Sequence, residues 1–149
     1  MNELRAFARL SRNDRVLLLQ AFACLASCSV RLRFQGFAKL QAWATEVGRG
    51  ALAVDRLYWA VKVALRLMPA ATCLCQALAL QRLLARHGHI SDLRIGVKKS
   101  SNGLRAHAWL VHDGRVLIGG SQSDQYKQLI VRDARGDITS GASMDSRRT

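Results

Sequence analysis

The chain contains little proline and few acidic residues, and both shortages narrow what it can be. Only one of its 149 residues is proline, and it has no low-complexity tract and no internal repeat. This excludes a proline-rich linker and a repeat array. Half of the residues are hydrophobic and 22% are charged. That composition indicates a globular domain with a core rather than a disordered chain.

The shortage of acidic residues leaves a strongly basic protein. The chain has ten acidic residues and 23 lysines and arginines, which gives a formal net charge of +13 at pH 7. Such a surface attracts polyanions, namely nucleic acid, an anionic membrane or acidic peptide. The basic residues are scattered through every segment, without a dense run interleaved with aromatics, and no known nucleic-acid-binding module occurs. We therefore expect no nucleic-acid partner, whereas an acidic peptide or protein partner stays open.

Cysteine is also scarce, with two pairs at spacings of C-x3-C (Cys24 and Cys28) and C-x-C (Cys73 and Cys75). These spacings fit no standard zinc pattern, so we expect neither a metal nor a cofactor. Cys24 and Cys28 lie one helical turn apart in an apolar stretch and are expected in the core. A disulfide framework does not suit a chain with this much core-forming sequence, and a reducing cytoplasm is the expected location.

Charge is absent from one long run, "VLLLQAFACLASCSV" (Val16 to Val30). The run is too short to span a bilayer easily. As part of a signal peptide it would follow an unusual leading region that contains Glu3 and Asp14. "LASC" matches a lipoprotein cleavage box, but matches of four residues arise often by chance. We expect a buried helix, and peripheral membrane contact through this helix stays open.

Three helices are predicted in the first part of the chain. Ser11 and Asp14 form a capping-box-like start, which predicts a helix from about Asp14 to Phe34. "GFAKLQAWATEVGRG" is left open because glycines interrupt it. "AVDRLYWAVKVALRLMP" predicts a helix, which the proline ends. The core stripe of that helix is Leu57, Ala60, Val61, Ala64 and Leu67. A third helix begins near Cys73, with Thr72 as its N-cap and a core stripe of Ala77, Leu80, Leu83 and Leu84.

The second part of the chain predicts a small antiparallel sheet. Apolar residues alternate with period two at Leu93, Ile95 and Val97, and "KKSSNG" then predicts a loop. "LRAHAWLV", the turn "HDGR" and "VLIGG" predict a hairpin, and 128–131 a last short strand. The predicted class is α+β, with N-terminal helices and a cysteine-bearing helix packed on the sheet. The predicted organisation is a helical segment 1–55, a core 56–135 and a polar tail 136–149.

Two residues in this arrangement could carry chemistry, Cys73 and His107. A thiol in the first turn of a helix faces unpaired N–H groups and the positive dipole end, both of which favour thiolate. A histidine on an adjacent strand can then act as general base and acid. Cys75 lies about 200° further around the helix at ~100° per residue, so it should face away from any partner of Cys73. Taken singly, such a thiol and such a ring are more often core residues.

The residues around these two positions resemble a known family. "RLMPAATCLCQALALQRLLARHGHISDLRIGV" followed by "AHAWLVHDGRVLIGG" is similar to the peptidase domain of lasso-peptide biosynthesis B proteins. The resemblance is to their stand-alone C-terminal form, a transglutaminase-like leader peptidase of the microcin J25-processing type. The similarity covers about residues 56–131. It implies a papain/transglutaminase-like α+β fold.

The resemblance also implies a function and partners. Such a protein would be a cysteine leader peptidase that removes the leader from a ribosomally synthesised lasso-peptide precursor. An ATP-dependent lasso cyclase would then close the macrolactam. The family's nucleophile maps onto Cys73 and its general base onto His107. The implied partners are the precursor with its leader, a separate leader-recognition protein and the cyclase. Residues 1–60 are the expected docking surface for these partners.

The acidic third member of the family's site has no clear match. If the turn centres on Asp113–Gly114, the residue numbers of paired residues in the hairpin sum to 227. This register predicts that His107 faces Gly120. No carboxylate stands there. Asp113 lies about 20 Å along the strand from His107 at ~3.3 Å per residue, so it is poorly placed to orient the ring.

The remaining candidates follow the hairpin. Asp124 could fold back after "GGSQS", and we predict it as the orienting third member. Ser121 or Gln122 would orient the ring less strongly. Trp109 is expected to pack beneath the site, and the backbone N–H of Cys73 is expected in the oxyanion hole.

Two other functions stay open. One is an enzyme of the same fold with a different acyl-transfer outcome, such as an amidase or a transglutaminase. The other is a weakly catalytic scaffold that holds the precursor for the cyclase. Thiol reactivity separates an enzyme from a scaffold, because a nucleophilic Cys73 should be alkylated fast and the other three cysteines slowly.

Overall fold

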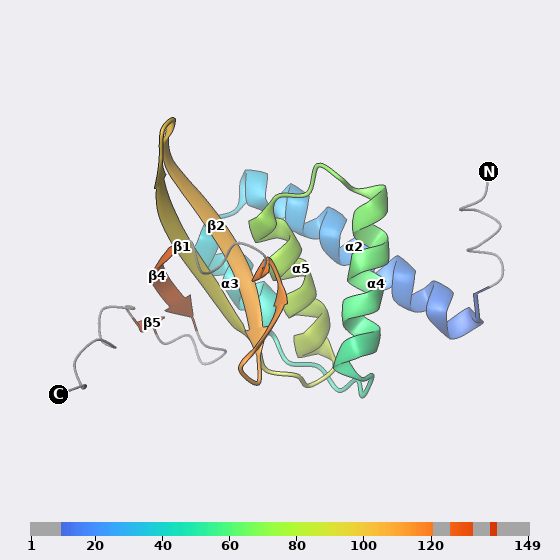
Figure 1. The fold of residues 1–149 in the computed structure, drawn as a ribbon. Helices are drawn as coiled ribbons and strands as arrows, with labels where there is room; N and C mark the ends of the chain where they lie inside the picture. The colour runs from blue at the N-terminus through green and yellow to red at the C-terminus, as the bar shows by residue number, and fades with distance from the viewer. Residues whose placement is uncertain (1–9, 121–125, 133–137, 140–149) are drawn as a thin grey trace.

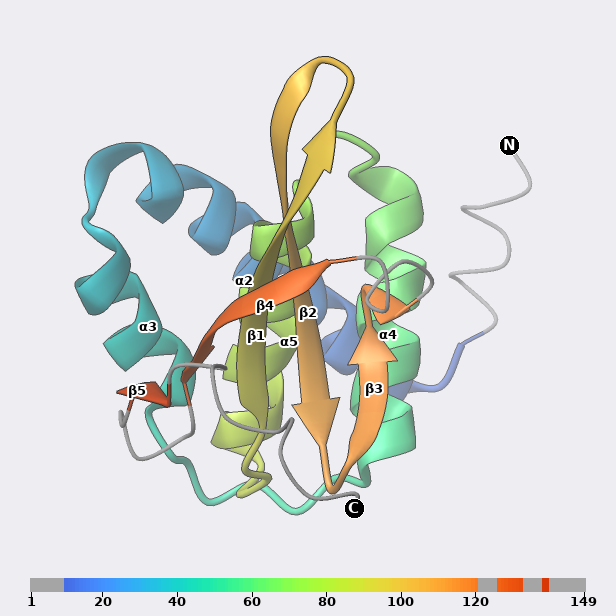
Figure 2. The same ribbon diagram turned by 60° about the vertical axis from the view of Figure 1, so that its left-hand side comes forward.

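Helices form the first part of the fold and strands the second (Figures 1 and 2). The computed structural model describes residues 10–120, 126–132 and 138–139. Its helices are α2 (Arg12–Phe34), α3 (Phe37–Thr45), α4 (Val54–Leu67) and α5 (Cys73–Arg86). Its strands are β1 (Asp92–Ser100), β2 (Gly103–His112), β3 (Arg115–Ile118), β4 (Lys127–Arg132) and β5 (Ile138–Thr139). They form one antiparallel sheet in the order β3-β2-β1-β4-β5, so the predicted α+β class is confirmed.

Helix α5 lies against the sheet behind β1 and β2, with α3 on one side of it and α4 on the other (Figure 2). It contacts α2, α3 and α4, and it packs against β2 and β1 of the sheet. The predicted core stripe is fully buried at Ala77, Leu80, Leu83 and Leu84. Helix α2 contributes to the same core, and its two cysteines, Cys24 and Cys28, are buried there as predicted. The position of α5 therefore determines where Cys73, its first residue, lies relative to the sheet.

The helix ends follow local chemistry that the sequence signals. The hydroxyl of Ser11 caps α2 by accepting a hydrogen bond from the N–H of Asp14 at 3.1 Å, and α2 begins two residues earlier than predicted. The carboxylate of Asp14 also pairs with Arg56, which ties the start of α2 to α4. Helix α4 ends before the proline, as predicted, but Leu67 was wrongly placed in the core. It is 65% exposed, because it lies at the edge of the apolar stripe and in the last turn.

The segment that the sequence left open forms α3. Gly36 precedes this helix and provides no side-chain cap, so local signals are weak. Tertiary contacts stabilise the helix in place of a cap. Leu40 and Ala44 are fully buried, and Arg82 of α5 donates a hydrogen bond to the carbonyl of Trp43 at 2.8 Å. The Arg82 guanidinium also lies over the Trp43 ring, 5.3 Å from its centroid.

Strands β1 and β2 pair along their whole length, and this corrects one prediction. "KKSSNG" was predicted as a loop, but Lys98, Lys99 and Ser100 belong to β1 and pair with residues of β2. Only Ser101 and Asn102 remain as the turn. The antiparallel pairing of β1 with β2 continues up to the turn, and its backbone hydrogen bonds outweigh a turn-forming composition. The predicted strand 128–131 is confirmed as part of β4, which pairs with the other edge of β1.

The β2–β3 hairpin has the predicted turn and a different register. Both central residues, Asp113 and Gly114, have positive φ (47° and 75°), as a type I′ turn requires. Next to the turn, paired residue numbers sum to 227, as predicted. A bulge between Leu110 and Val111 then shifts the register, and Leu110 pairs with Ile118. The predicted opposition of His107 and Gly120, which assumed a constant register, is therefore wrong.

Candidate active site

Cys73 is the first residue of α5, and the residue before it caps the helix. The hydroxyl oxygen of Thr72 accepts a hydrogen bond from the N–H of Cys75 at 3.3 Å, which confirms the predicted helix start and N-cap. The N–H groups of Cys73 and Leu74 have no acceptor within the helix, because the carbonyls that would serve them precede it. Cys73 itself is partly exposed. Free N–H groups and the positive dipole end therefore lie beside an accessible sulfur, where they suit a developing negative charge.

Cys75 belongs to the core instead. It is 1% exposed, and its Sγ lies 3.2 Å from the hydroxyl oxygen of Ser29 and 3.5 Å from the carbonyl oxygen of Leu25, both on α2. Hydrogen bonds from Cys28 and from Ser29 favour the thiolate and lower the pKa of Cys75 to about 7, although burial acts in the opposite direction. The same interaction with Cys75, together with burial, raises the pKa of Cys28. Cys75 therefore points away from the accessible side of the turn, as the helical phase predicts.

The ring of His107 is held in one orientation by a backbone carbonyl. Its Nε2 lies 2.7 Å from the carbonyl oxygen of Gly119. A carbonyl only accepts hydrogen bonds, so Nε2 must carry the proton, and Nδ1 of the neutral ring is left as the basic nitrogen. The ring also stacks on Trp109 (centroids 6.1 Å apart) and tilts against Tyr126 (5.1 Å). Trp109 is 4% exposed, as expected of a residue that packs beneath the ring.

Glycine is required at position 119 by geometry. Its φ is +79°, and a Cβ added there would lie 2.6 Å from the carbonyl oxygen of Ala108 and 2.9 Å from Cβ of Trp109. Only a residue without a side chain can therefore bring this carbonyl to His107. This contact was not predicted from the sequence, where a side chain was expected to orient the ring. The adjacent glycines after β3 were the available signal, since glycine at a strand end often marks a close backbone approach.

Cys73 and His107 come from elements that pack together, since α5 contacts β2. Among the described residues, however, no hydrogen bond is found between their side chains. Side chains alternate along a strand. Ala108 and Leu110 face the core with α5, so His107 and Trp109 lie on the opposite face of β2. Direct proton transfer between the Cys73 sulfur and the His107 ring would therefore require the ring to move to the other face of β2 or α5 to shift.

The predicted third member, Asp124, lies outside the described residues, as do Ser121 and Gln122. Asp113 is described and does not approach His107. Its carboxylate lies 3.4 Å from Nε2 of His112, at the turn of the hairpin. In the part of the chain that the structure describes, the carbonyl of Gly119 is thus the group that orients the His107 ring.

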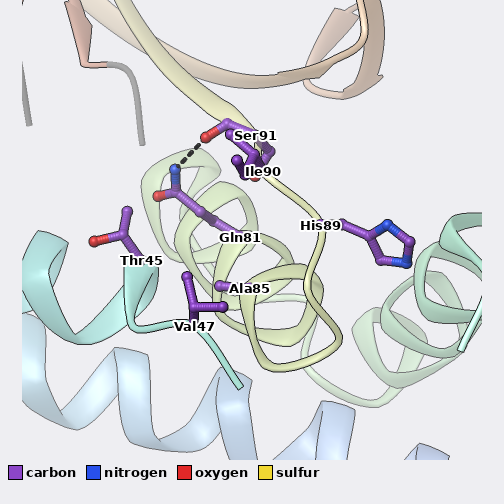
Figure 3. Close-up of a pocket in the computed structure, with 7 residues that line it drawn as sticks. All are labelled: Thr45, Val47, Gln81, Ala85, His89, Ile90 and Ser91. Atoms are coloured by element: carbon purple, nitrogen blue, oxygen red, sulfur yellow. Dashed lines mark hydrogen bonds between the residues drawn. The ribbon is translucent and has the colours of Figure 1, made fainter. Parts of the chain in front are cut away.

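A pocket lies near the opposite end of α5 from Cys73 (Figure 3). Thr45 and Val47 line it from the end of α3, Gln81 and Ala85 from α5, and 89–91 from the segment before β1. Its polar contact is structural, because Gln81 donates to the carbonyl of Ser91 at 2.9 Å. The described residues contain no group of three or more histidine, cysteine or acidic side chains that could hold a metal. The pocket therefore adds nothing to the Cys73 and His107 chemistry.

Comparison with known proteins places the chain in a family. No curated protein and no solved structure matches the chain. A protein-family model described as "Transglutaminase-like superfamily" (Transglut_core3) matches residues 16–131. The match includes α2 as well as Cys73 and His107, and the helices packed on an antiparallel sheet are consistent with that fold. Since the match covers more than half of the sequence, the chain belongs to the transglutaminase-like superfamily.

Proposed function

We propose that the chain is a cysteine leader peptidase, which removes the leader from a ribosomally synthesised lasso-peptide precursor. The observation that carries the proposal is the start of α5, where a partly exposed cysteine follows a capping threonine in a member of the transglutaminase-like superfamily. Members of this superfamily are mostly cysteine hydrolases and transferases. The resemblance of the Cys73 and His107 motifs to lasso-peptide B proteins supports the finer assignment.

The proposed reaction proceeds in two balanced steps. Nδ1 of His107 takes the proton of the Cys73 thiol, which requires the ring and the sulfur to approach each other. The thiolate then attacks the scissile carbonyl carbon, and the resulting oxyanion accepts a hydrogen bond from the Cys73 N–H. The C–N bond breaks as the leaving amine takes a proton from His107, and a thioester remains. Water then attacks the thioester and gives a proton to His107. The C–S bond breaks and the thiol is restored. His107 acts through Nδ1, the nitrogen that the Gly119 contact leaves free.

The proposed partners follow from the same assignment. The precursor is held through its leader by a separate recognition protein, and an ATP-dependent cyclase uses the amine that cleavage frees. We place these events in the cytoplasm, where thiols stay reduced. The four cysteines of the chain are all free thiols, so none is tied up in a disulfide.

A second candidate is a weakly catalytic scaffold that holds the precursor for the cyclase. The separation of Cys73 from His107 favours it, because the ring lies on the strand face that points away from α5. A scaffold needs the binding surface of the superfamily fold but not the contact between thiol and imidazole.

Cleavage of the precursor, followed by intact mass, tests the proposal. The purified chain is mixed with precursor and the leader-recognition protein, with the Cys73→Ala variant as the matched control. Hydrolysis gives two fragments whose masses sum to that of the precursor plus one water. A product joined to an added primary amine would instead indicate transglutaminase-type acyl transfer. Intact precursor with both proteins, bound equally by the parent and by Cys73→Ala, would identify a scaffold.

A further inference from the structure

Helix α2 has two apolar faces, and only one of them is covered. The inner face, with Leu17, Leu18 and Leu25, is buried in the core. On the opposite side five large apolar side chains are exposed, by 48%, 60%, 41%, 56% and 80%; these are Val16, Leu19, Phe22, Val30 and Phe34. We call these five the outer face of α2. Large exposed apolar patches on proteins often mark interaction sites, whereas single exposed apolar residues do not.

The outer face runs along one side of α2, with Val16, Leu19 and Phe22 near its start and Val30 and Phe34 near its end. At ~100° per residue the five side chains fall within an arc of about 120° around the helix. Between Arg15 and Arg31 the helix contains no charged residue. At ~1.5 Å per residue this uncharged part is about 22 Å long. The stripe is long and narrow, as expected for contact with an extended apolar surface.

The charges around the stripe are positive. Arg12 and Arg15 are exposed at one end of α2 and Arg33 at the other. Asp14 is the one acidic residue of the helix, and its carboxylate pairs with Arg56. A second copy of the chain is therefore a poor partner, because pairing two such helices in either direction places arginine against arginine. The net charge of +13 opposes self-association further.

We propose that the outer face of α2 binds the surface of an anionic membrane. The apolar stripe would enter the boundary between head groups and acyl chains, and the three exposed arginines would contact lipid phosphates. By length and composition α2 could cross a membrane, but its inner face is packed into the protein. Spanning would require Leu17, Leu18 and Leu25 to leave the core, whereas lying in the interface leaves that core intact.

Vesicle sedimentation tests this proposal on the full chain. Vesicles of phosphatidylcholine with phosphatidylglycerol are compared with vesicles of phosphatidylcholine alone, at low and high salt. We expect binding to the anionic vesicles at low salt and much weaker binding to the neutral ones. High salt should reduce binding, because it screens the arginine contribution.

Two sets of substitutions locate the surface. Leu19→Gln combined with Phe22→Gln should lower partitioning at least about tenfold, since burial of large apolar side chains drives insertion. The matched control replaces apolar residues of similar exposure outside α2, Ile90→Gln with Leu104→Gln, and should bind like the parent. Phe34→Gln, at the last and 80% exposed position of α2, repeats the test with the least risk to folding.

The arginines have their own matched pair. Arg12→Gln with Arg15→Gln should weaken binding to anionic vesicles by roughly tenfold or more, because each basic residue near the surface contributes about fivefold. Arg49→Gln with Arg105→Gln, which removes the same charge from exposed positions elsewhere, should have a smaller effect.

Three results would overturn the proposal. The first is failure of the parent chain to sediment with anionic vesicles. The second is equal loss in the α2 variants and in their controls, which would indicate nonspecific attraction of a basic protein. The third is concentration-dependent dimerisation in sedimentation velocity without lipid that Leu19→Gln with Phe22→Gln abolishes. That result would assign the outer face to a protein partner.

Discussion

The first turn of α5 carries two thiols with opposite surroundings. Cys73 is partly exposed beside the free N–H groups of the helix start, whereas Cys75 is 1% exposed and contacts α2 through Ser29 and Leu25. The two differ by only two positions in the sequence. Because two residues correspond to about 200° of rotation, one helical turn presents one sulfur to solvent and the other to the core.

The comparison separates acidity from accessibility. Hydrogen bonds from Cys28 and Ser29 lower the pKa of the Cys75 thiol, although its burial acts in the opposite direction. Its burial also keeps electrophiles and peptides away. A reactive cysteine needs both thiolate character and access. A lowered thiol pKa therefore does not by itself identify the nucleophile in this turn.

The largest expected effect distinguishes the two thiols directly. Cys73→Ala should abolish precursor cleavage, because the reaction then lacks its nucleophile. Cys75→Ala should retain most of the activity and lose some stability, since it removes a buried side chain and its contact with Ser29. Cleavage rates and urea unfolding of the two variants provide the measurement. Equal loss of cleavage at equal stability would mean that the assignment of roles within the turn is wrong.

Alkylation offers the same distinction without a substrate. With iodoacetamide at neutral pH we expect Cys73 to be modified first and the buried Cys24, Cys28 and Cys75 slowly. Tandem mass spectrometry locates the modified sulfur. In denaturant all four thiols should react at similar rates, which controls for intrinsic reactivity. Faster modification of Cys75 than of Cys73 in the folded protein would contradict the role of access.

Loss of His107 should have the next largest effect. His107→Ala should reduce cleavage by about 10²–10⁴-fold, the usual contribution of a general acid–base residue. His112→Ala is the matched control on the same strand, because His112 contacts the carbonyl of Ile90 at 2.6 Å rather than the Gly119 carbonyl. Single-turnover cleavage measures both variants. If His107→Ala cleaves at the parent rate, Cys73 works without this ring, and their separation in the structure is the active arrangement.

The orientation of His107 should matter less than its presence. Gly119→Ala would force a side chain against the carbonyl of Ala108 and into a strained φ, at a cost of about 1–3 kcal/mol. We expect cleavage to fall by roughly ten- to a hundredfold, because the ring loses the contact that fixes its tautomer. Asp124→Asn is the complementary variant. Parent-rate cleavage by Gly119→Ala together with loss in Asp124→Asn would transfer the orienting role to the carboxylate.

Some of these contacts could be predicted from the sequence and others could not. The start of α5 was predictable, because Thr72 and the spacing of the core leucines are local signals that the structure satisfies. The bulge at Leu110 and Val111 was not, since it depends on how β3 returns along β2. The Gly119 contact was equally hidden, because a backbone carbonyl is common to all residues and only its placement is specific. Residue types thus predicted most of the elements, whereas α3, the end of β1 and the register that orients His107 required the structure.

Substrate binding should be separable from the chemistry of this turn. Pocket contacts around one bond discriminate weakly, whereas binding a leader elsewhere raises the effective concentration of the cleavage site. We expect the leader-recognition protein to lower the apparent KM roughly tenfold with little change in kcat. Rates over a range of precursor concentrations, with and without that protein, give the answer. Full-speed, leader-selective cleavage by the chain alone would place leader recognition within residues 1–60.

The smallest effect concerns the cap that both thiols share. Thr72 precedes Cys73, and its hydroxyl accepts the hydrogen bond from the N–H of Cys75. Thr72→Ala should lower the free energy of unfolding by about 1 kcal/mol, the usual cost of losing an N-cap. Thr72→Ser keeps the hydroxyl and should restore most of it. Because the cap fixes the first turn, Thr72→Ala should also slow alkylation or cleavage at Cys73 by only a few-fold. Urea unfolding and the alkylation rate at Cys73 provide the two readings. Unchanged stability in Thr72→Ala would mean that packing of Cys75 against α2, rather than the cap, holds the start of α5.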